Sequence, residues 1–293
     1  MSDFGIAPPG FRLPGATRLG RVSLQVADLA RSLAFYEEVL GFRVTASAPG
    51  RASLAAGGDD APLVELHEKP GVRPVPRRGL LGLFHFAILL PDRESLGRLV
   101  THLAEIGAHA GMSDHAVSEA LYLSDPDGLG IEVYADRPRA TWRREGQQLY
   151  MTTQPLDVAS LVSAAGATRW SGMPNGTTIG HVHLHVGDLE QAAAFYHTGL
   201  GLDKVVWGYP GALFLSAGGY HHHLGTNTWA AGAAPAGAGD ARLLEWEIIV
   251  PDAAAAAAAA SSLAAAGHRA DAVGDAWRAT DPWGTTLAVR GER

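Results

Sequence analysis

Histidine and glutamate residues at matching positions of a repeated sequence are the groups in this chain best suited to chemistry. The segment around Arg21 recurs 160 residues later around His181, and the segment around His85 recurs at the same offset around Glu245. Imidazole nitrogens and carboxylate oxygens can bind a divalent ion or transfer protons, whereas a guanidinium cannot ligate a cation. Where one copy keeps a ligand-type residue that the other has lost, the copy that keeps it therefore marks the chemistry.

The composition excludes several classes of protein. Cysteine is absent from the 293 residues, so disulfides, thiolate metal sites and cysteine nucleophiles are excluded. Hydrophobic residues make up 47% and charged residues 18%, which is typical of a soluble globular protein of about two domains. The 23 basic and 30 acidic residues give a net charge of −7, which favours neither nucleic acid nor a membrane as a partner. The N-terminal residues lack the pattern of a signal peptide, so a cytoplasmic location is expected.

Four units of similar pattern must position these residues. Each unit opens with a strand of alternating polarity, and these strands begin near Gly20, Leu83, Ile179 and Leu243. A helix and three further strands follow in each unit, so the predicted order is βαβββ, four times. The chain is therefore expected to be an α+β protein built by duplication.

The first two units show the pattern most clearly. Unit one has a predicted helix at 29–40 that ends at Gly41, and later strands at 51–56 and 62–68. Unit two has a predicted helix at 93–106 and strands at 117–124 and 129–134, which the turn Asp125-Pro-Asp-Gly128 connects. Residues 136–176 are interpreted as a linker with one helix at 157–165.

The repeated signature is an apolar strand, then Asp-Leu, then a helix that contains Ala-Phe-Tyr and ends at Leu-Gly. It resembles the vicinal oxygen chelate superfamily, which includes glyoxalase I, bleomycin and fosfomycin resistance proteins and extradiol ring-cleaving dioxygenases. The strings Phe84-His-Phe-Ala-Ile-Leu-Leu-Pro, Ser113-Asp-His-Ala-Val-Ser-Glu-Ala-Leu-Tyr122 and Gly218-Gly-Tyr-His-His-His223 are similar to two-domain bacterial catechol 2,3-dioxygenase-type proteins. The resemblance implies two tandem glyoxalase-like domains, at 18–135 and 177–290, whose modules pair into open curved-sheet bowls that hold a divalent metal.

The resemblance also implies that metal ligands come from the first and last strands of each module. The first-strand positions of units one to four are Arg21, His85, His181 and Glu245. The last-strand positions, in the same order, are Glu65, Glu132, Gly225 or Thr226, and Ala288.

Dioxygenases of this superfamily need two histidines and one carboxylate, with open positions for substrate and oxygen. Units three and four fail this requirement, and units one and two place Arg21 among the ligands. Units two and three together supply His85, Glu132 and His181. The sequence therefore predicts that unit two pairs with unit three around Fe(II), with Mn(II) as the alternative metal. Units one and four would then form a metal-free counterpart.

Other interpretations of these residues stay open. A lone histidine on an apolar strand is more often a hydrogen-bonded core residue than a ligand, and Glu132 alone could be a carboxylate at the rim of a sheet. It is the match of three residues to one template that favours a metal site. A site made of Glu65, His85 and Glu132 is the alternative, and Arg21 is the main objection to it.

Catechol cleavage also needs groups that accept and return protons. In related enzymes a histidine of a paired-His strand does this, which points to His222 in a predicted strand at 220–224. The register is open by one residue within 221–223, and a solvated histidine cluster is the alternative. Tyr122 matches a pocket tyrosine of the family. His115 matches a further polar pocket residue, although it could be an ordinary loop histidine.

His183 and His185 share a strand face with His181 by their period of two. They are interpreted as pocket wall or as support behind the ligands, and not as ligands.

Three functions are compatible with these patterns. The first is a metal-dependent extradiol dioxygenase that acts on a small aromatic diol with O₂. The second is a glyoxalase-like lyase or isomerase, and the third is a non-catalytic binding protein of the same fold. The histidines at 221–223 favour the dioxygenase over the lyase or isomerase. The intact ligand set argues against a non-catalytic binding protein. A homodimer is expected because sheet edges are exposed.

Overall fold

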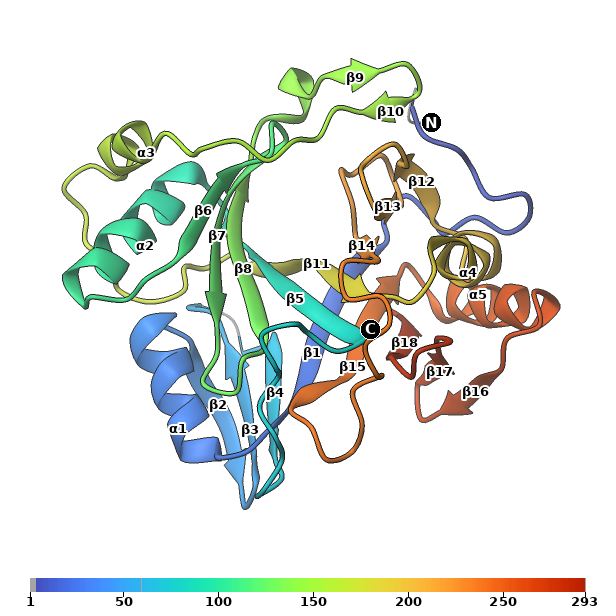
Figure 1. Cartoon of the computed structure of the whole chain (residues 1–293), viewed down its shortest axis with the longest axis horizontal. Helices are drawn as coiled ribbons and strands as arrows, with labels where there is room; N and C mark the ends of the chain where they lie inside the picture. The colour runs from blue at the N-terminus through green and yellow to red at the C-terminus, as the bar shows by residue number, and fades with distance from the viewer. Residues whose placement is uncertain (1–3, 59, 293) are drawn as a thin grey trace.

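The computed structural model describes residues 4–58 and 60–292, which contain four βαβββ modules and a linker (Figure 1). The elements of modules 1 and 2 are, in order, β1 (Arg18–Val26), α1 (Leu29–Ala34), the π-helix η1 (Phe35–Val39), β2 (Arg43–Ala48), β3 (Arg51–Ala55), β4 (Val64–Glu68), β5 (Gly82–Leu89), α2 (Arg93–Glu105), β6 (Gly111–Asp114), β7 (Ser118–Ser124) and β8 (Gly130–Asp136).

The linker holds the 3-10 helix η2 (Arg139–Thr141), β9 (Arg144–Glu145), β10 (Gln148–Leu149) and α3 (Val158–Ala165). Modules 3 and 4 consist of β11 (Thr178–His185), α4 (Leu189–Ala193), the π-helix η3 (Ala194–Gly199), β12 (Asp203–Val206), β13 (Ala212–Ser216), β14 (Leu224–Asn227), β15 (Arg242–Val250), α5 (Ala253–Ala265), β16 (Ala270–Val273), β17 (Ala276–Thr280) and β18 (Thr286–Gly291). The predicted α+β class and the βαβββ order are confirmed in all four modules.

The modules pair across the two halves of the chain. One eight-stranded sheet has the order β12-β13-β14-β11-β5-β8-β7-β6 and so joins module 2 to module 3. The other has the order β16-β17-β18-β15-β1-β4-β3-β2 and joins module 1 to module 4. The predicted pairing is confirmed, and the sequence halves 18–135 and 177–290 are interleaved, since each sheet takes one module from each half.

Antiparallel pairing of two first strands forms the centre of each sheet. In one sheet β5 pairs with β11, and in the other β1 pairs with β15. The first strand of each module also pairs in parallel with the last strand of its own module. First and last strands, which carry the expected ligand positions, therefore lie side by side at the middle of each bowl.

An aspartate begins the helix of every module. Its carboxylate accepts a hydrogen bond from the backbone N–H three residues on, which satisfies one of the free donors of the first turn. The four N-cap residues are Asp28, Asp92, Asp188 and Asp252. The repeated Asp in the sequence signature thus fixes where each strand gives way to its helix.

The helix predicted at 29–40 is not a single α-helix. It begins at Leu29 as expected, but it passes into η1 over its last turn, and module 3 repeats this with η3. Tyr36 and Tyr196 lie within these two π-helices, and both are completely buried. Gly41 follows with φ of +79°, as predicted for the residue that ends the helix.

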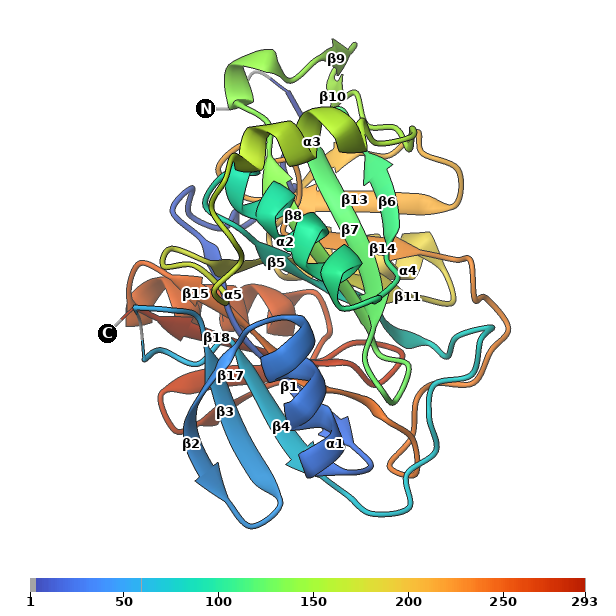
Figure 2. The ribbon, with the colours of Figure 1, turned by 90° about the vertical axis from the view of Figure 1, so that its left-hand side faces the viewer.

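The linker packs on module 2 and crosses the open side of the module 2/3 sheet. The predicted helix at 157–165 is confirmed as α3, which Asp157 caps. Figure 2 shows α3 beside α2, and the helices approach closely because Gly97 has no side chain to meet the carbonyl of Leu161. Figure 1 shows β9 and β10 spanning the space between modules 2 and 3. Within 4–58 and 60–292, no helix is long and apolar enough to cross a membrane.

Candidate metal centre

Three buried residues from adjacent strands converge at the middle of the module 2/3 sheet. His85 lies on β5, and the strands on either side of β5 carry Glu132 (β8) and His181 (β11). Their side chains are buried, with exposures of 4%, 3% and 1% for His85, Glu132 and His181. Among the residues that the structure describes, they are the group of histidines and carboxylates close enough together to hold a metal ion.

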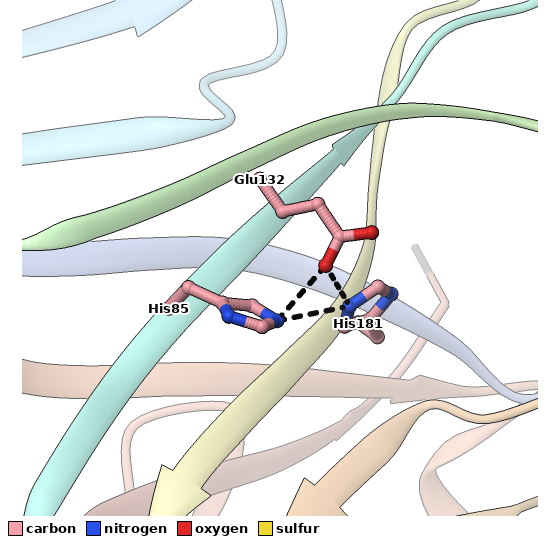
Figure 3. A group of neighbouring side chains, drawn as sticks. All are labelled: His85, Glu132 and His181. Carbon is pink, nitrogen blue, oxygen red and sulfur yellow. Dashed lines mark hydrogen bonds and ion pairs between the residues drawn. The ribbon is translucent and has the colours of Figure 1, made fainter. Parts of the chain in front are cut away.

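The three donor atoms lie as ligands on one face of an octahedron would. Oε2 of Glu132 is 3.0 Å from Nε2 of His85 and 3.1 Å from Nε2 of His181, and the two nitrogens are 3.4 Å apart (Figure 3). Ligands at right angles with bonds of about 2.1 Å are separated by about 3 Å. The predicted set of two imidazoles and one carboxylate is thus brought together in a geometry that fits a divalent ion.

The protonation of these groups also suits a cation. Burial alone would raise the pKa of Glu132, but the charges and hydrogen bonds of His181 and His85 hold it well below its ordinary value. Burial lowers the pKa of His181 to about 4, against the opposing effect of Glu132. At neutral pH Glu132 is therefore ionised and His181 is neutral, the forms in which both can bind a metal.

Aromatic packing supports the imidazole of His181. Nδ1 of His181 is buried and has no hydrogen-bond partner in the described part of the chain. Its ring instead packs between aromatic rings, 4.0 Å from that of His222 and 5.0 Å from that of Tyr134. Packing, and not a hydrogen bond at Nδ1, therefore supports the side of this imidazole that faces away from Glu132.

The module 1/4 sheet carries ion pairs at the matching positions. Nη1 of Arg21 is 3.1 Å from Glu65, and its Nε is 3.2 Å from Glu247. Arg278, which matches Tyr122, pairs with Glu245. The alternative site made of Glu65, His85 and Glu132 is wrong, because Glu65 lies on β4 of this second sheet.

The last strand of module 3 supplies no side-chain ligand to the candidate site. Of the two residues left open for the last strand of module 3, Gly225 is the one that pairs with His183, as Glu65 pairs with Ser23 in module 1. A Cβ atom on Gly225 would lie 2.9 Å from Cγ of the His183 ring. The ring of His183 occupies the space of a fourth ligand.

A cavity of about 330 Å³ adjoins the candidate metal centre on the side of His85 and Glu132. His85 and Glu132 contribute to its wall. Its polar wall comes from β6, β7 and the linker, and its aromatic wall from β5, β13 and nearby loops. The remaining lining residues are Phe84, Ser113, His115, Ser118, Tyr122, Met151, Thr152, Thr153, His183, Tyr209, Phe214, His222 and Trp229.

Tyr122 and His115 lie together in this wall, as predicted from their positions. Nδ1 of His115 is 2.7 Å from the carbonyl oxygen of Thr152, which can only accept, so this nitrogen carries the proton. Nε2 of His115 then accepts from the hydroxyl of Tyr122 at 2.6 Å. Tyr122 also faces Glu132 across the β7–β8 pair, and burial together with the charge of Glu132 raises its pKa well above the ordinary value.

His222 lines the cavity, whereas His221 and His223 are not among the lining residues. The strand predicted at 220–224 is wrong, because residues 220–223 are irregular and β14 begins only at Leu224. Gly218 and Gly219, both with positive φ, turn the chain just before this segment. Because the segment is not a strand, neighbouring histidine rings can touch: Nδ1 of His221 lies 2.7 Å from Nδ1 of His222.

His183 and His185 both contact Asn227. His183 forms part of the cavity wall and accepts a hydrogen bond at Nε2 from Nδ2 of Asn227, at 3.0 Å. Nδ1 of His185 lies 2.7 Å from Oδ1 of the same asparagine. Neither belongs to the group that could hold the ion.

Sequence reasoning missed the contribution of the linker. Residues 151–153 form part of the cavity wall, and they are held there by the backbone pairing of Asp114 with Gln154 and by a 3.0 Å contact between Thr153 Oγ1 and the hydroxyl of Tyr209. No pattern in the linker sequence indicated this role. The aromatic residues Phe84, Tyr209, Phe214 and Trp229 were missed as well, since each looks like an ordinary core or loop residue.

Comparison with known proteins agrees with this architecture. The family model of the Glyoxalase/Bleomycin resistance protein/Dioxygenase superfamily matches residues 18–133 and 178–282, and the chain belongs to this superfamily. Over 270 residues the chain is 46% identical to Catechol-2,3-dioxygenase of Bacillus subtilis (strain 168), which covers 91% of this chain and 94% of that protein. The chain is therefore a homologue of a two-domain bacterial dioxygenase, as its motifs suggested.

Solved structures share the fold at low sequence identity. A candidate dioxygenase from Bacillus subtilis subsp. subtilis str. 168 superposes with a TM-score of 0.66 at 14% identity, covering 96% of this chain and 86% of that one. Glyoxalase I from Zea mays superposes with a TM-score of 0.56 at 19% identity, covering 94% and 92%. At these identities the likeness establishes the arrangement of modules and nothing about the reaction.

Proposed function

We propose that this protein is a metal-dependent extradiol dioxygenase that cleaves a small catechol-type diol with O₂. The proposal assigns His85, Glu132 and His181 as ligands of Fe(II), with Mn(II) as the alternative metal. The observation that carries it is the arrangement of two imidazoles and one carboxylate on one side of a cavity, with Gly225 where a fourth ligand would stand. A divalent ion held by three residues keeps positions open for both diol oxygens and O₂.

Each part of the cavity has a role in this proposal. A bound iron would supply charge stabilisation and hold the diol and O₂ together. Phe84, Phe214 and Trp229 provide apolar walls for a single aromatic ring. His222 accepts a proton from a diol hydroxyl and returns it later, because it is a buried neutral imidazole that lines the cavity and contacts the ring of His181. Its pKa is lowered well below the ordinary value, chiefly by burial.

We assign Tyr122, supported by His115, to hydrogen bonding with one oxygen of the bound diol. Because His115 holds the Tyr122 hydroxyl in one orientation, the lone pairs and proton of that hydroxyl are positioned before substrate arrives. The 46% identity to a catechol-2,3-dioxygenase supports the same reaction class.

A lyase or isomerase is the alternative enzyme, and Gly225 argues against it. Such a reaction needs a carboxylate base where the further acidic ligand would sit, and Gly225 under the His183 ring offers none. A non-catalytic binding protein would not need three donor atoms within 3.4 Å of one another. The homodimer stays a prediction, which light scattering of the purified protein would test.

The deciding experiment compares metals in the same protein. The protein is purified without metal, loaded anaerobically with Fe(II), Mn(II) or Zn(II), and mixed with catechol and O₂. We expect a yellow ring-cleavage product and matching O₂ uptake with Fe(II), and no product with Zn(II), which has no redox chemistry. Failure with both Fe(II) and Mn(II), combined with turnover of a thiol–dicarbonyl adduct by the Zn(II) form, would replace the dioxygenase with the lyase.

A further inference from the structure

A chain of hydrogen bonds leads from the protein surface to His222 and is not used by the function proposed above. It begins at Asp136, the last residue of β8, whose side chain is 27% exposed. Oδ1 of Asp136 lies 2.8 Å from Nε2 of His221, and Nδ1 of His221 lies 2.7 Å from Nδ1 of His222. His221 is completely buried, so these two contacts account for both of its ring nitrogens.

The polarity of this chain follows from what each group can do. An ionised carboxylate only accepts hydrogen bonds, so Nε2 of His221 carries a proton. In a neutral ring Nδ1 of His221 is then an acceptor, and Nδ1 of His222 must donate to it. Nε2 of His222 is left with the lone pair.

The surroundings hold this arrangement in place. The hydroxyl of Tyr220 also donates to Oδ1 of Asp136, at 3.2 Å, which is longer than the 2.8 Å contact of that oxygen with His221. The rings of Trp142 and Tyr134 lie 5.4 Å and 5.9 Å from that of His221 and shield it from water. A buried imidazole with no water to exchange with takes its tautomer from its fixed partners.

We propose that Asp136 is a positioning residue that acts through His221 to fix the tautomer of His222. With Nδ1 protonated, His222 presents the lone pair of Nε2 to the cavity. The O–H bond of a diol hydroxyl can then break, with its electron pair left on oxygen and an N–H bond formed at Nε2. The opposite tautomer presents an N–H group and cannot accept this proton. This inference rests on the acid–base role of His222 in the proposed dioxygenase.

The first test uses the metal-free protein, so it does not depend on catalysis. Nitrogen NMR of ¹⁵N-histidine-labelled protein distinguishes protonated from unprotonated ring nitrogens, and the His222→Gln and His221→Gln variants assign the signals. We expect His222 to be protonated at Nδ1 in the wild type and to lose this single state in Asp136→Ala. An unchanged tautomer in Asp136→Ala, or a wild-type His222 protonated at Nε2, would overturn the proposal.

The second test measures catechol cleavage by the Fe(II)-loaded protein. Asp136→Ala should lower kcat by roughly 10- to 100-fold, within the range that a positioned acid–base group contributes. KM should change little because Asp136 does not line the cavity. Asp136→Glu, which keeps the carboxylate, should restore part of kcat.

Tyr220→Phe is the matched control. It removes a hydrogen bond to the same oxygen of Asp136 but leaves the contact with His221, so both the tautomer and kcat should stay near the wild type. Equal loss of kcat in Tyr220→Phe and Asp136→Ala, with an unchanged tautomer in both, would show a merely structural effect and reject the proposal. A wild-type protein without activity would instead count against the dioxygenase, and the NMR result would still decide the tautomer.

Discussion

Arg21 and His181 hold the same position on the first strands of modules 1 and 3, and they meet opposite electrostatic needs. The guanidinium of Arg21 lies between Glu65 and Glu247, at 3.1 Å and 3.2 Å. The imidazole of His181 lies 3.1 Å from Glu132 and joins a group that fits a metal ion. One sheet thus contains its own cation, whereas the other sheet has a group of residues that could bind one.

The first prediction concerns the ligands. His85→Ala and His181→Ala should each lower the affinity for Fe(II) by more than the roughly 10- to 100-fold that loss of a group behind a ligand costs. Competition with a coloured chelator measures this. His183→Ala is the control, because His183 is buried nearby on the strand of His181 but lies outside the ligand group. Full metal affinity in either of the first two variants would break the assignment.

The second prediction concerns Arg21. Arg21→Met should lower the free energy of unfolding by about 1–2 kcal/mol, because it removes one of the two guanidinium groups that pair with the buried Glu247 and leaves Arg290 and a backbone N–H. Arg18→Met should have little effect, since the ion pair between Arg18 and Glu292 is exposed. Chemical denaturation measures both.

Metal content and catechol cleavage should be unchanged in Arg21→Met, because Arg21 is in the module 1/4 sheet. Loss of bound iron in this variant would show that the two sheets are coupled in a way that the structure does not indicate.

The third prediction concerns Gly225. Gly225→Ala places a methyl group 2.9 Å from the ring of His183, which lines the cavity, so the ring or the β14 backbone must shift. We expect kcat/KM for catechol to fall by at least ~10-fold while iron stays bound, because no ligand is altered. Gly10→Ala, where an added Cβ meets nothing within 4 Å, is the control. Wild-type kinetics in Gly225→Ala would mean that His183 does not shape the site.

The fourth prediction concerns pH and stability. Burial raises the pKa of Asp125 to about 7, despite hydrogen bonds from the backbone of Leu129 and Asp127. A carboxyl group whose pKa is raised by folding stabilises the protein while it is protonated, and this stability is lost as the pH rises from about 4 through 7. Asp125→Asn, which cannot ionise, should therefore gain stability relative to the wild type over that range, by up to about 4 kcal/mol.

Thermal unfolding between pH 4 and pH 8 measures this difference, and Asp281→Asn is the matched comparison. Asp281 holds the same turn in module 4, but its Oδ2 accepts a hydrogen bond from Tyr196 at 2.9 Å, whereas Oδ2 of Asp125 has no partner within the described residues. The gain in Asp281→Asn should be smaller. A constant difference between Asp125→Asn and the wild type at all pH values would reject the raised pKa.

Much of this protein follows from local sequence. Strand alternation, the N-cap aspartates and Gly41 act within a few residues, so the βαβββ order is readable without a structure. Module pairing was also predictable once the family resemblance had indicated the ligand positions, because His85, Glu132 and His181 can then act together and Arg21 cannot ligate a cation. Residues that bind the same ion must lie close together, so the possible ligands limit which modules can pair.

Only the tertiary structure decided the remaining features. Three features join residues that are far apart in sequence, so no local pattern predicts them. They are the part of the cavity wall formed by residues 151–153, the His183 ring over Gly225 and the hydrogen bond between Asp136 and His221. The segment 220–223 was predicted to be part of a strand, yet it is irregular, and it follows a turn at Gly218 and Gly219 and carries histidines that contact one another and Asp136. Local patterns determine which helices and strands form. The orientation of individual side chains depends instead on long-range packing, because its energy is shared among many residues and is not encoded at any single one.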